Sequence, residues 1–259
     1  MRLLPREHGA YGQIAFPLIT AFGVAGLSAG GSLLAIAIVA GFLAHEPAAI
    51  LLGLRGTRAR RYQQAAAARC AGACLVVAIA AAAAGLAMTS PAARWSFTLP
   101  LVPAVWLGLS TATGREKSWH GEVAAATAFS AAAVPICLAG GAPIRIGAAV
   151  AIPFALLFVA GTLAVRVVIL RVRGGGDPRA ATATCRAVFA VVGIGIATLV
   201  GLAAANLIPS AVVAAAAAGL LIVTGIAAYP PSPLQLRSIG WTLVLLSFLT
   251  AATVVAAVR

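Results

Sequence analysis

The stretch SLLAIAIVAGFLAHEPAAILLGL, residues 32–54, decides the class of fold. Apart from His45 and Glu46 it holds no ionisable side chain. A helix of about 20 apolar residues crosses the hydrocarbon core of a bilayer. Lipid accepts only helices or closed barrels, and a continuous apolar run of this length is not a short alternating barrel strand. The stretch therefore predicts a transmembrane helix.

The same pattern recurs along the chain. Its 259 residues are 62% hydrophobic and 9% charged, and the mean hydropathy of +1.06 excludes an ordinary soluble domain. We predict one all-α integral membrane domain over residues 1–259, a polytopic bundle with no separate soluble domain. The apolar runs predict nine spans, at residues 10–28, 32–54, 67–88, 96–113, 119–139, 146–170, 182–204, 207–228 and 237–258.

The basic residues predict the orientation, because loops rich in Lys and Arg stay in the cytoplasm. With nine spans, 14 of the 18 cations fall on the side of the N-terminus, three fall on the other side, and Arg166 lies inside a span. The N-terminus is therefore expected in the cytoplasm. The net charge of +13 is then mainly topological and favours contact with anionic membrane lipid. Nucleic acid is not an expected partner, since no soluble basic domain exists to bind it.

Three of the five acidic residues lie within two positions of the three histidines, at Glu7-His8, His45-Glu46 and His120-Gly121-Glu122. In the predicted topology all three clusters face the cytoplasmic half of the membrane, where Arg166 also lies. Ionisable groups at membrane depth are costly unless they are paired or hydrated, so they indicate a functional site. We expect one cavity open to the cytoplasm, lined by the candidate catalytic residues Glu7, His8, His45, Glu46, His120, Glu122 and Arg166.

Each of these residues also has a structural interpretation. Glu122 falls in a first helical turn, where the helix dipole favours a carboxylate. His120 could lie at the head-group interface, and Arg166 could extend to the cytoplasmic surface. His45-Glu46 is the pair least open to such an account, since it is expected about 15 Å from the end of its span at 1.5 Å per residue. Pro47 is expected to bend the helix beside it.

Two kinds of chemistry suit the clusters. His8, His45 and His120 could bind a divalent metal or haem, or the histidines and glutamates could act as acid–base groups. No H-E-x-x-H pattern lies on one helix, which excludes a zinc-protease site. Arg55, Arg58 and Arg61 follow the second span and are candidate substrate-binding residues for a phosphate-bearing group. The four cysteines lack the spacing of a zinc module.

A resemblance rests on these residues. Pro5-Arg6-Glu7-His8-Gly9-Ala10-Tyr11-Gly12, then Ala44-His45-Glu46-Pro47, Gly121-Glu122 and the stretch from Thr162 to Arg166 resemble the YwiC-like family of bacterial membrane proteins, over essentially the whole chain. Tyr11 stands where that family usually has Trp. The resemblance implies a multi-pass protein of the bacterial cytoplasmic (inner) membrane.

Nine spans with a polar motif near the end of span 2 are also similar to UbiA-type prenyltransferases, which implies a UbiA-like arrangement. In that superfamily aspartate-rich motifs after spans 2 and 6 hold Mg²⁺ and an isoprenyl diphosphate. Here His45-Glu46-Pro47 with Arg55–Arg61, and Arg166–Asp177, occupy those regions, and the aspartates are missing.

Three functions remain open from the sequence. The first is a UbiA-like membrane enzyme acting on a lipid, isoprenoid or quinone-like substrate, with His and Glu in place of Asp. The second is a metal- or haem-binding protein that uses His8, His45 and His120. The third is a non-catalytic transporter or assembly factor in which the clusters relay protons.

Overall fold

The computed structural model describes residues 3–5, 8–115, 118–172, 178–232 and 235–258, without the side chains of His8 and Val172. Within these residues all regular structure is helical. The helices of the first half are α1 (His8–Ala25), α2 (Ala29–Leu51), α3 (Thr57–Ala87), α4 (Pro91–Ser96), α5 (Thr98–Ala112), α6 (Trp119–Ala131) and α7 (Ala133–Ala139). Those of the second half are α8 (Ile144–Val172), α9 (Pro178–Ala204), α10 (Ser210–Ala228) and α11 (Leu236–Val258).

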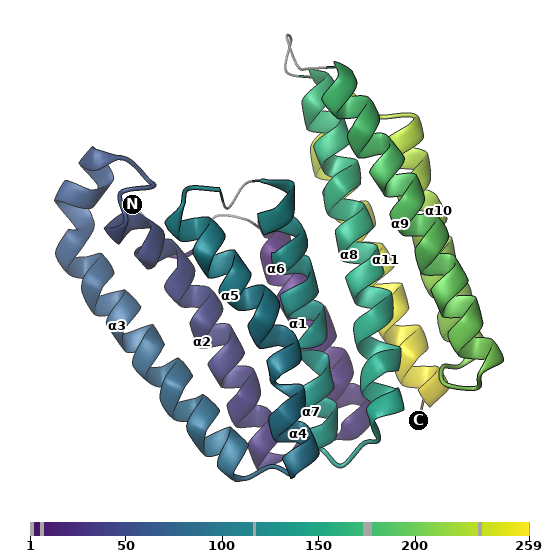
Figure 1. Ribbon diagram of the computed structural model, residues 1–259, viewed down its shortest axis with the longest axis horizontal. Coiled ribbons are helices and arrows are strands. Elements are labelled where there is room, and N and C mark those ends of the chain that lie inside the picture. The colour runs from purple at the N-terminus through teal and green to yellow at the C-terminus, as the bar shows by residue number, and fades with distance from the viewer. Residues whose placement is uncertain (1–2, 6–7, 116–117, 173–177, 233–234, 259) are drawn as a thin grey trace.

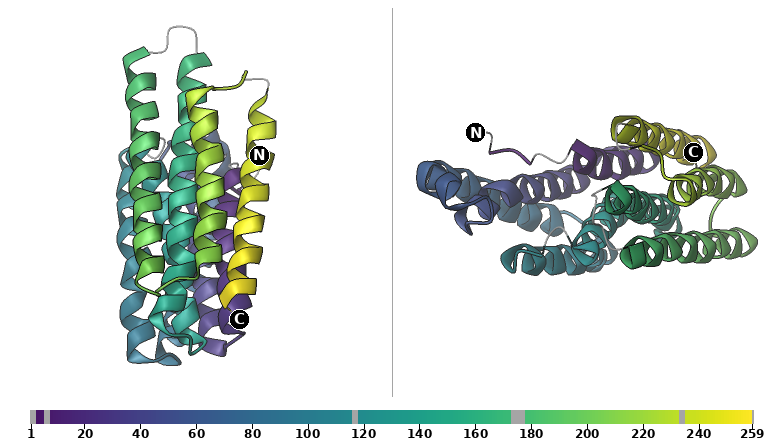
Figure 2. Two further views of the ribbon diagram at one scale, coloured as in Figure 1. Left: turned by 90° about the vertical axis from the view of Figure 1, so that its right-hand side faces the viewer. Right: turned by 90° about the horizontal axis from the view of Figure 1, so that it is seen from above.

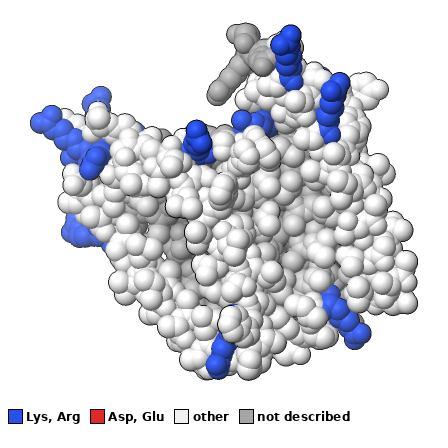
Figure 3. All heavy atoms as spheres, viewed as in Figure 1, with Lys and Arg blue, Asp and Glu red and all other residues white. Residues whose placement is uncertain are grey.

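These helices confirm a polytopic helical bundle. Within the described residues, eight helical segments are long and apolar enough to cross a membrane, and Gly9–Ala25 is a shorter apolar helix. The nine segments correspond to the nine predicted spans and run alternately up and down (Figure 1). We call the end where α2, α5, α8 and α10 finish the basic end, because it carries most of the exposed arginines (Figure 3).

Two predicted spans consist of two helices each, and a proline accounts for each break. Pro100 lies four residues after Ser96, the last residue of α4, and Pro135 lies four residues after Ala131, the last residue of α6. A proline ring clashes with the carbonyl of the residue four positions before it and cannot donate a hydrogen bond to that carbonyl. By contrast, α2 continues through Pro47 to Leu51.

The region after span 2 differs from the sequence-based expectation. It was expected to be a loop up to residue 66, but α3 begins at Thr57 and extends over 31 residues. That length is about 46 Å at 1.5 Å per residue, well beyond the ~30 Å hydrocarbon core. Arg58 and Arg61 therefore lie on the first turns of a helix, where both are exposed. Ala, Arg and Gln favour helix, which explains the extension.

Helix α8 lies between the α1–α7 helices and the α9–α11 helices (Figure 2). One apolar core joins it to α1, α2, α6 and α7 and includes Phe154 and Ile136. A second core joins α8 to α9, α10 and α11 and includes Leu157 and Leu220. Because lipid tails are as apolar as these side chains, close packing holds such helices together.

Small residues permit a close approach between α2 and α3. A Cβ atom on Gly30 would lie 2.6 Å from Cγ2 of Thr89, and one on Gly85 would lie 3.1 Å from the carbonyl oxygen of Gly30. This contact lies at the end opposite the basic end, and it fixes α3 against α2 as the two helices run toward the candidate site.

Candidate functional site

Glu46 is held by Arg55 near the end of α2. The carboxylate is 2% exposed, and the Arg55 guanidinium reaches it with Nη2 at 2.7 Å from Oε2 and Nε at 3.1 Å from Oε1. The Arg55 side chain is 22% exposed. This bidentate geometry is the strongest form of an arginine–carboxylate pair. The Arg55 guanidinium therefore contacts a carboxylate of the protein itself, and its expected role in substrate binding stays a prediction.

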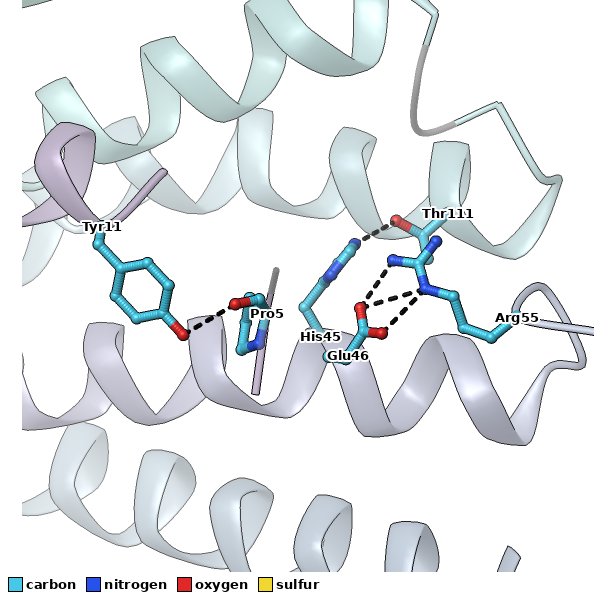
Figure 4. A network of polar contacts seen from close by, with 6 residues as sticks. All are labelled: Pro5, Tyr11, His45, Glu46, Arg55 and Thr111. Atoms are coloured by element: carbon cyan, nitrogen blue, oxygen red, sulfur yellow. Dashed lines mark hydrogen bonds and ion pairs between the residues drawn. The ribbon is translucent and has the colours of Figure 1, made fainter. Parts of the chain in front are cut away.

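The turn after α2 brings Arg55 back to Glu46. The helix ends in a left-handed turn at Gly53, with φ of +79°. There Leu54 N–H donates to the carbonyl of Ala49 at 2.9 Å, and Gly53 N–H donates to that of Ile50 at 3.0 Å. Gly56 has φ of +92°, and glycine accepts both conformations without a Cβ clash. The short reversal leaves Arg55 facing the helix that precedes it (Figure 4).

The helix also ends earlier than expected. Since α2 finishes at Leu51, His45 and Glu46 lie about 9 and 8 Å from its end at 1.5 Å per residue. The expected depth of about 15 Å was too large because the last three residues of the predicted span belong to the turn. The pair is therefore close enough to the basic end for a loop arginine to reach it.

His45 is half-buried and contacts α5. Its Nε2 lies 3.3 Å from the hydroxyl oxygen of Thr111, a residue that is 4% exposed. The Thr111 hydroxyl donates to the carbonyl of Leu107 at 2.9 Å. A hydroxyl has only one hydrogen, so Thr111 is left as the acceptor and the neutral ring is assigned a proton on Nε2. Figure 4 shows His45, Glu46 and Arg55 gathered in the space between α2 and α5.

Aromatic side chains pack beside this group and connect it to α1. Tyr11 meets Phe42 edge-on at 5.2 Å between ring centroids, and Phe42 meets Phe129 edge-on at 5.5 Å. The Tyr11 hydroxyl donates to the carbonyl of Pro5 at 3.1 Å. Thus Tyr11, from the first sequence motif, and Phe42, one turn before His45, belong to the same structural unit.

A second ion pair joins α6 to α8. Nη1 of Arg166 lies 3.1 Å from Oε2 of Glu122, and the two side chains are 28% and 32% exposed. Arg166 thus contacts Glu122, the acidic residue of the third sequence cluster. Ser118 caps the start of α6 by accepting a hydrogen bond from Gly121 N–H at 3.3 Å, which places Glu122 at the end of the first turn.

The remaining candidate residues are His120, Glu7 and His8. His120 is exposed and stacks on Trp119, with 3.6 Å between ring centroids. Glu7 and the His8 side chain lie outside the described residues. Among the side chains that are described, no group of three or more His, Cys, Asp or Glu is placed to hold a metal ion. Metal binding by His8, His45 and His120 therefore stays a prediction.

Two cavities are described, and neither is lined by a candidate catalytic residue. One of ≈ 630 Å³ lies at the basic end between α8 and α10, and one of ≈ 380 Å³ lies at the opposite end near Arg145. We expected one cavity lined by all seven candidate residues. Neither of these two cavities supports that expectation, which stays a prediction. The surface is also hollowed between α5 and the α2–α3 pair (Figure 3).

Sequence reasoning did not select Thr111 or Gln13. Gln13 Nε2 donates to the Thr162 hydroxyl at 3.3 Å and so connects α1 to α8. Gln13 is an uncharged polar residue within an apolar span, and this pattern could have identified it as a residue that makes a polar contact between helices. Thr111 carries no such signal, because threonines in spans commonly bond to their own helix backbone, and Thr111 does so as well.

The fold and these contacts define a multi-pass helical membrane protein with buried, paired ionisable groups near one end. A family model described as YwiC-like protein matches residues 4–137, slightly more than half of the chain. The chain belongs to the YwiC-like protein family, which confirms the resemblance drawn from the sequence. The matched region includes the Glu46–Arg55 and His45–Thr111 contacts entirely, and Glu122 but not Arg166. No curated protein and no solved structure matches the chain.

Proposed function

We propose that the protein is a membrane enzyme that binds a lipid, prenyl or quinone-like molecule between α2 and α5 and exchanges a proton with it through His45. The observation that carries the proposal is the pairing of the buried Glu46 with Arg55 directly beside a histidine that is itself held by Thr111. Placing ionisable side chains within a membrane costs free energy. Such residues therefore indicate a functional site.

The residues take different roles. A buried ion pair contributes little to stability compared with apolar residues of the same size, so stability alone does not explain Glu46 and Arg55. Their mutual neutralisation makes them positioning residues that fix the end of α2. His45 is the next residue along the helix and the group best suited to proton exchange, because histidine changes charge near neutral pH. Thr111 orients its ring.

The substrate class follows from the surroundings. The helices on either side of the site are largely lipid-facing, with exposed Val76 and Ile79 on α3 and exposed Val102 and Trp106 on α5. A molecule that enters between them comes from the bilayer and carries an apolar tail. The exposed Arg58 and Arg61 lie on the first turns of α3 and would favour a phosphate-bearing or otherwise anionic head group.

Photo-crosslinking tests this proposal. Purified protein is irradiated with a photoactivatable prenyl diphosphate or with a photoactivatable benzoquinone bearing a prenyl tail, and the labelled peptides are mapped. We expect label on α2 and α5 near His45 and Thr111 that an excess of the unlabelled compound removes. Uniform label on the lipid-facing helices, unaffected by the competitor, would overturn the proposal.

A matched pair of threonine variants sharpens the test. Thr111→Val removes the hydroxyl that holds His45, and Thr242→Val removes an exposed hydroxyl that bonds only to the carbonyl of Ser238 at 3.0 Å among the described contacts. We expect the first variant to reduce specific labelling and the second to leave it unchanged.

A further inference from the structure

We propose that the cavity at the basic end, between α8 and α10, binds the phosphate group of an anionic membrane phospholipid. It has a volume of ≈ 630 Å³ and is lined by Val168 and Arg171 of α8 and by residues 228–232, where α10 ends. The proposal does not rest on the proposed function, because none of these residues belongs to the His45 site.

The lining has the chemistry of a phosphate site. Arg171 offers a planar guanidinium that can donate two parallel hydrogen bonds to phosphate oxygens. Tyr229 adds a hydroxyl group and is 86% exposed. Tyrosine is typical of the membrane interface, where its ring lies among acyl chains and its hydroxyl reaches the head groups. Val168, fully buried, forms an apolar floor.

The charge around the cavity favours an anion. Arg186 on α9 and Arg237 on α11 are exposed toward the same end, and Figure 3 shows basic side chains gathered there. The described residues of α8, α9, α10 and α11 include no acidic side chain. Basic residues near an anionic bilayer surface attract its head groups.

A lipid accounts for the site better than a soluble phosphate does. Below the cavity, α10 exposes Leu221 and Ile222, which are 60% and 45% exposed. These residues lie about two turns from Ala228, a distance of roughly 10 Å along the helix. Acyl chains attached to a phosphate held at Arg171 would cover this apolar surface, whereas a free phosphate would leave it bare. Both ligands share the phosphate chemistry, so the experiment separates them.

Native mass spectrometry of the full-length protein in detergent provides the test, with dioleoylphosphatidylglycerol, dioleoylphosphatidylcholine and inorganic phosphate as probes. We expect preferential binding of phosphatidylglycerol, which Arg171→Gln weakens about tenfold through loss of the bidentate contact. Arg171→Lys, which keeps the charge without the fork, should give an intermediate loss. Arg60→Gln, an exposed arginine on α3 at the same end, is the matched control and should bind like the parent protein.

Three results would overturn the inference. Equal binding of the two lipids would remove the need for an anionic ligand. Undiminished phosphatidylglycerol binding by Arg171→Gln and Arg171→Lys, both folded by circular dichroism, would place the lipid elsewhere. Displacement of the lipid by millimolar inorganic phosphate would identify a soluble phosphate as the ligand instead.

Discussion

Glu46 and Arg55 lie nine residues apart in the sequence, and their side chains meet at 2.7 Å because two glycines turn the chain back over the end of α2. The carboxylate is 2% exposed and the guanidinium is 22% exposed. The two partners are therefore unequal. If its partner is lost, Arg55 can turn toward the surface. Glu46 is buried and cannot reach water in the same way.

This inequality predicts different costs for the two single substitutions. Arg55→Gln leaves a buried carboxylate uncompensated and should lower the free energy of unfolding by about 3 kcal/mol. Glu46→Gln keeps a polar group of the same size and should cost about 1 kcal/mol. The double variant should cost less than the two singles added. Thermal unfolding in detergent measures all three, and strictly additive losses would show that the two side chains do not interact.

The Glu122–Arg166 pair should contribute much less to the free energy of unfolding than the Glu46–Arg55 pair. Both of its side chains are close to one-third exposed, and exposed pairs contribute about 0–1 kcal/mol. Arg166→Gln should therefore lower the unfolding free energy by under about 1 kcal/mol, clearly less than Arg55→Gln. A loss as large as that of Arg55→Gln in the same unfolding assay would mean that this pair is buried in the folded protein.

The turn that carries Arg55 depends on Gly53. Its φ of +79° is unfavourable for any residue with a Cβ atom, so Gly53→Ala should cost roughly 1–2 kcal/mol. Gly41→Ala provides the control, since Gly41 lies in α2 with nothing within 4 Å of an added Cβ. That substitution should stabilise the helix by about 0.5–1 kcal/mol. We expect Gly53→Ala to lower the melting temperature and Gly41→Ala to raise it. Equal changes in the two variants would show that the turn tolerates alanine.

The contact between α2 and α3 should be sensitive to size at Gly85. An added Cβ would lie 3.1 Å from the Gly30 carbonyl oxygen, while one on Gly72 in the same helix meets nothing within 4 Å. Gly85→Leu should destabilise the pair by at least about 1–3 kcal/mol through overpacking, and Gly72→Leu should be near neutral. Comparable melting temperatures for the two variants would contradict this packing.

The fold followed from hydropathy because each span is long and carries few ionisable groups. Span ends were harder to predict. The arginine-rich start of α3 has residues that favour helix, yet hydropathy predicts a loop there, because hydropathy detects only the segments that lie in lipid. Pro100 and Pro135 follow helix breaks, whereas Pro47 lies within a continuous helix.

The candidate site was predicted in part. The unusual cost of ionisable groups in apolar segments identified His45, Glu46, Glu122 and Arg166, and the structure pairs the last two. The partner of Glu46 was not predicted, because it depends on the backbone angles of Gly53 and Gly56 rather than on residue spacing. Thr111 was missed since only tertiary contact distinguishes it from other threonines.

Lipidomics of cells that lack this protein tests the central claim, proton exchange by His45 with a lipid-like substrate, most directly. Cells complemented with the parent protein should regain a lipid, prenyl or quinone-like species that the deleted cells lose, or clear one that they accumulate. His45→Gln, inserted and folded at the same level, should lower this restoration by about 10²-fold or more, as expected for loss of an acid–base group. Thr242→Val should restore fully. Full restoration by His45→Gln would contradict the account.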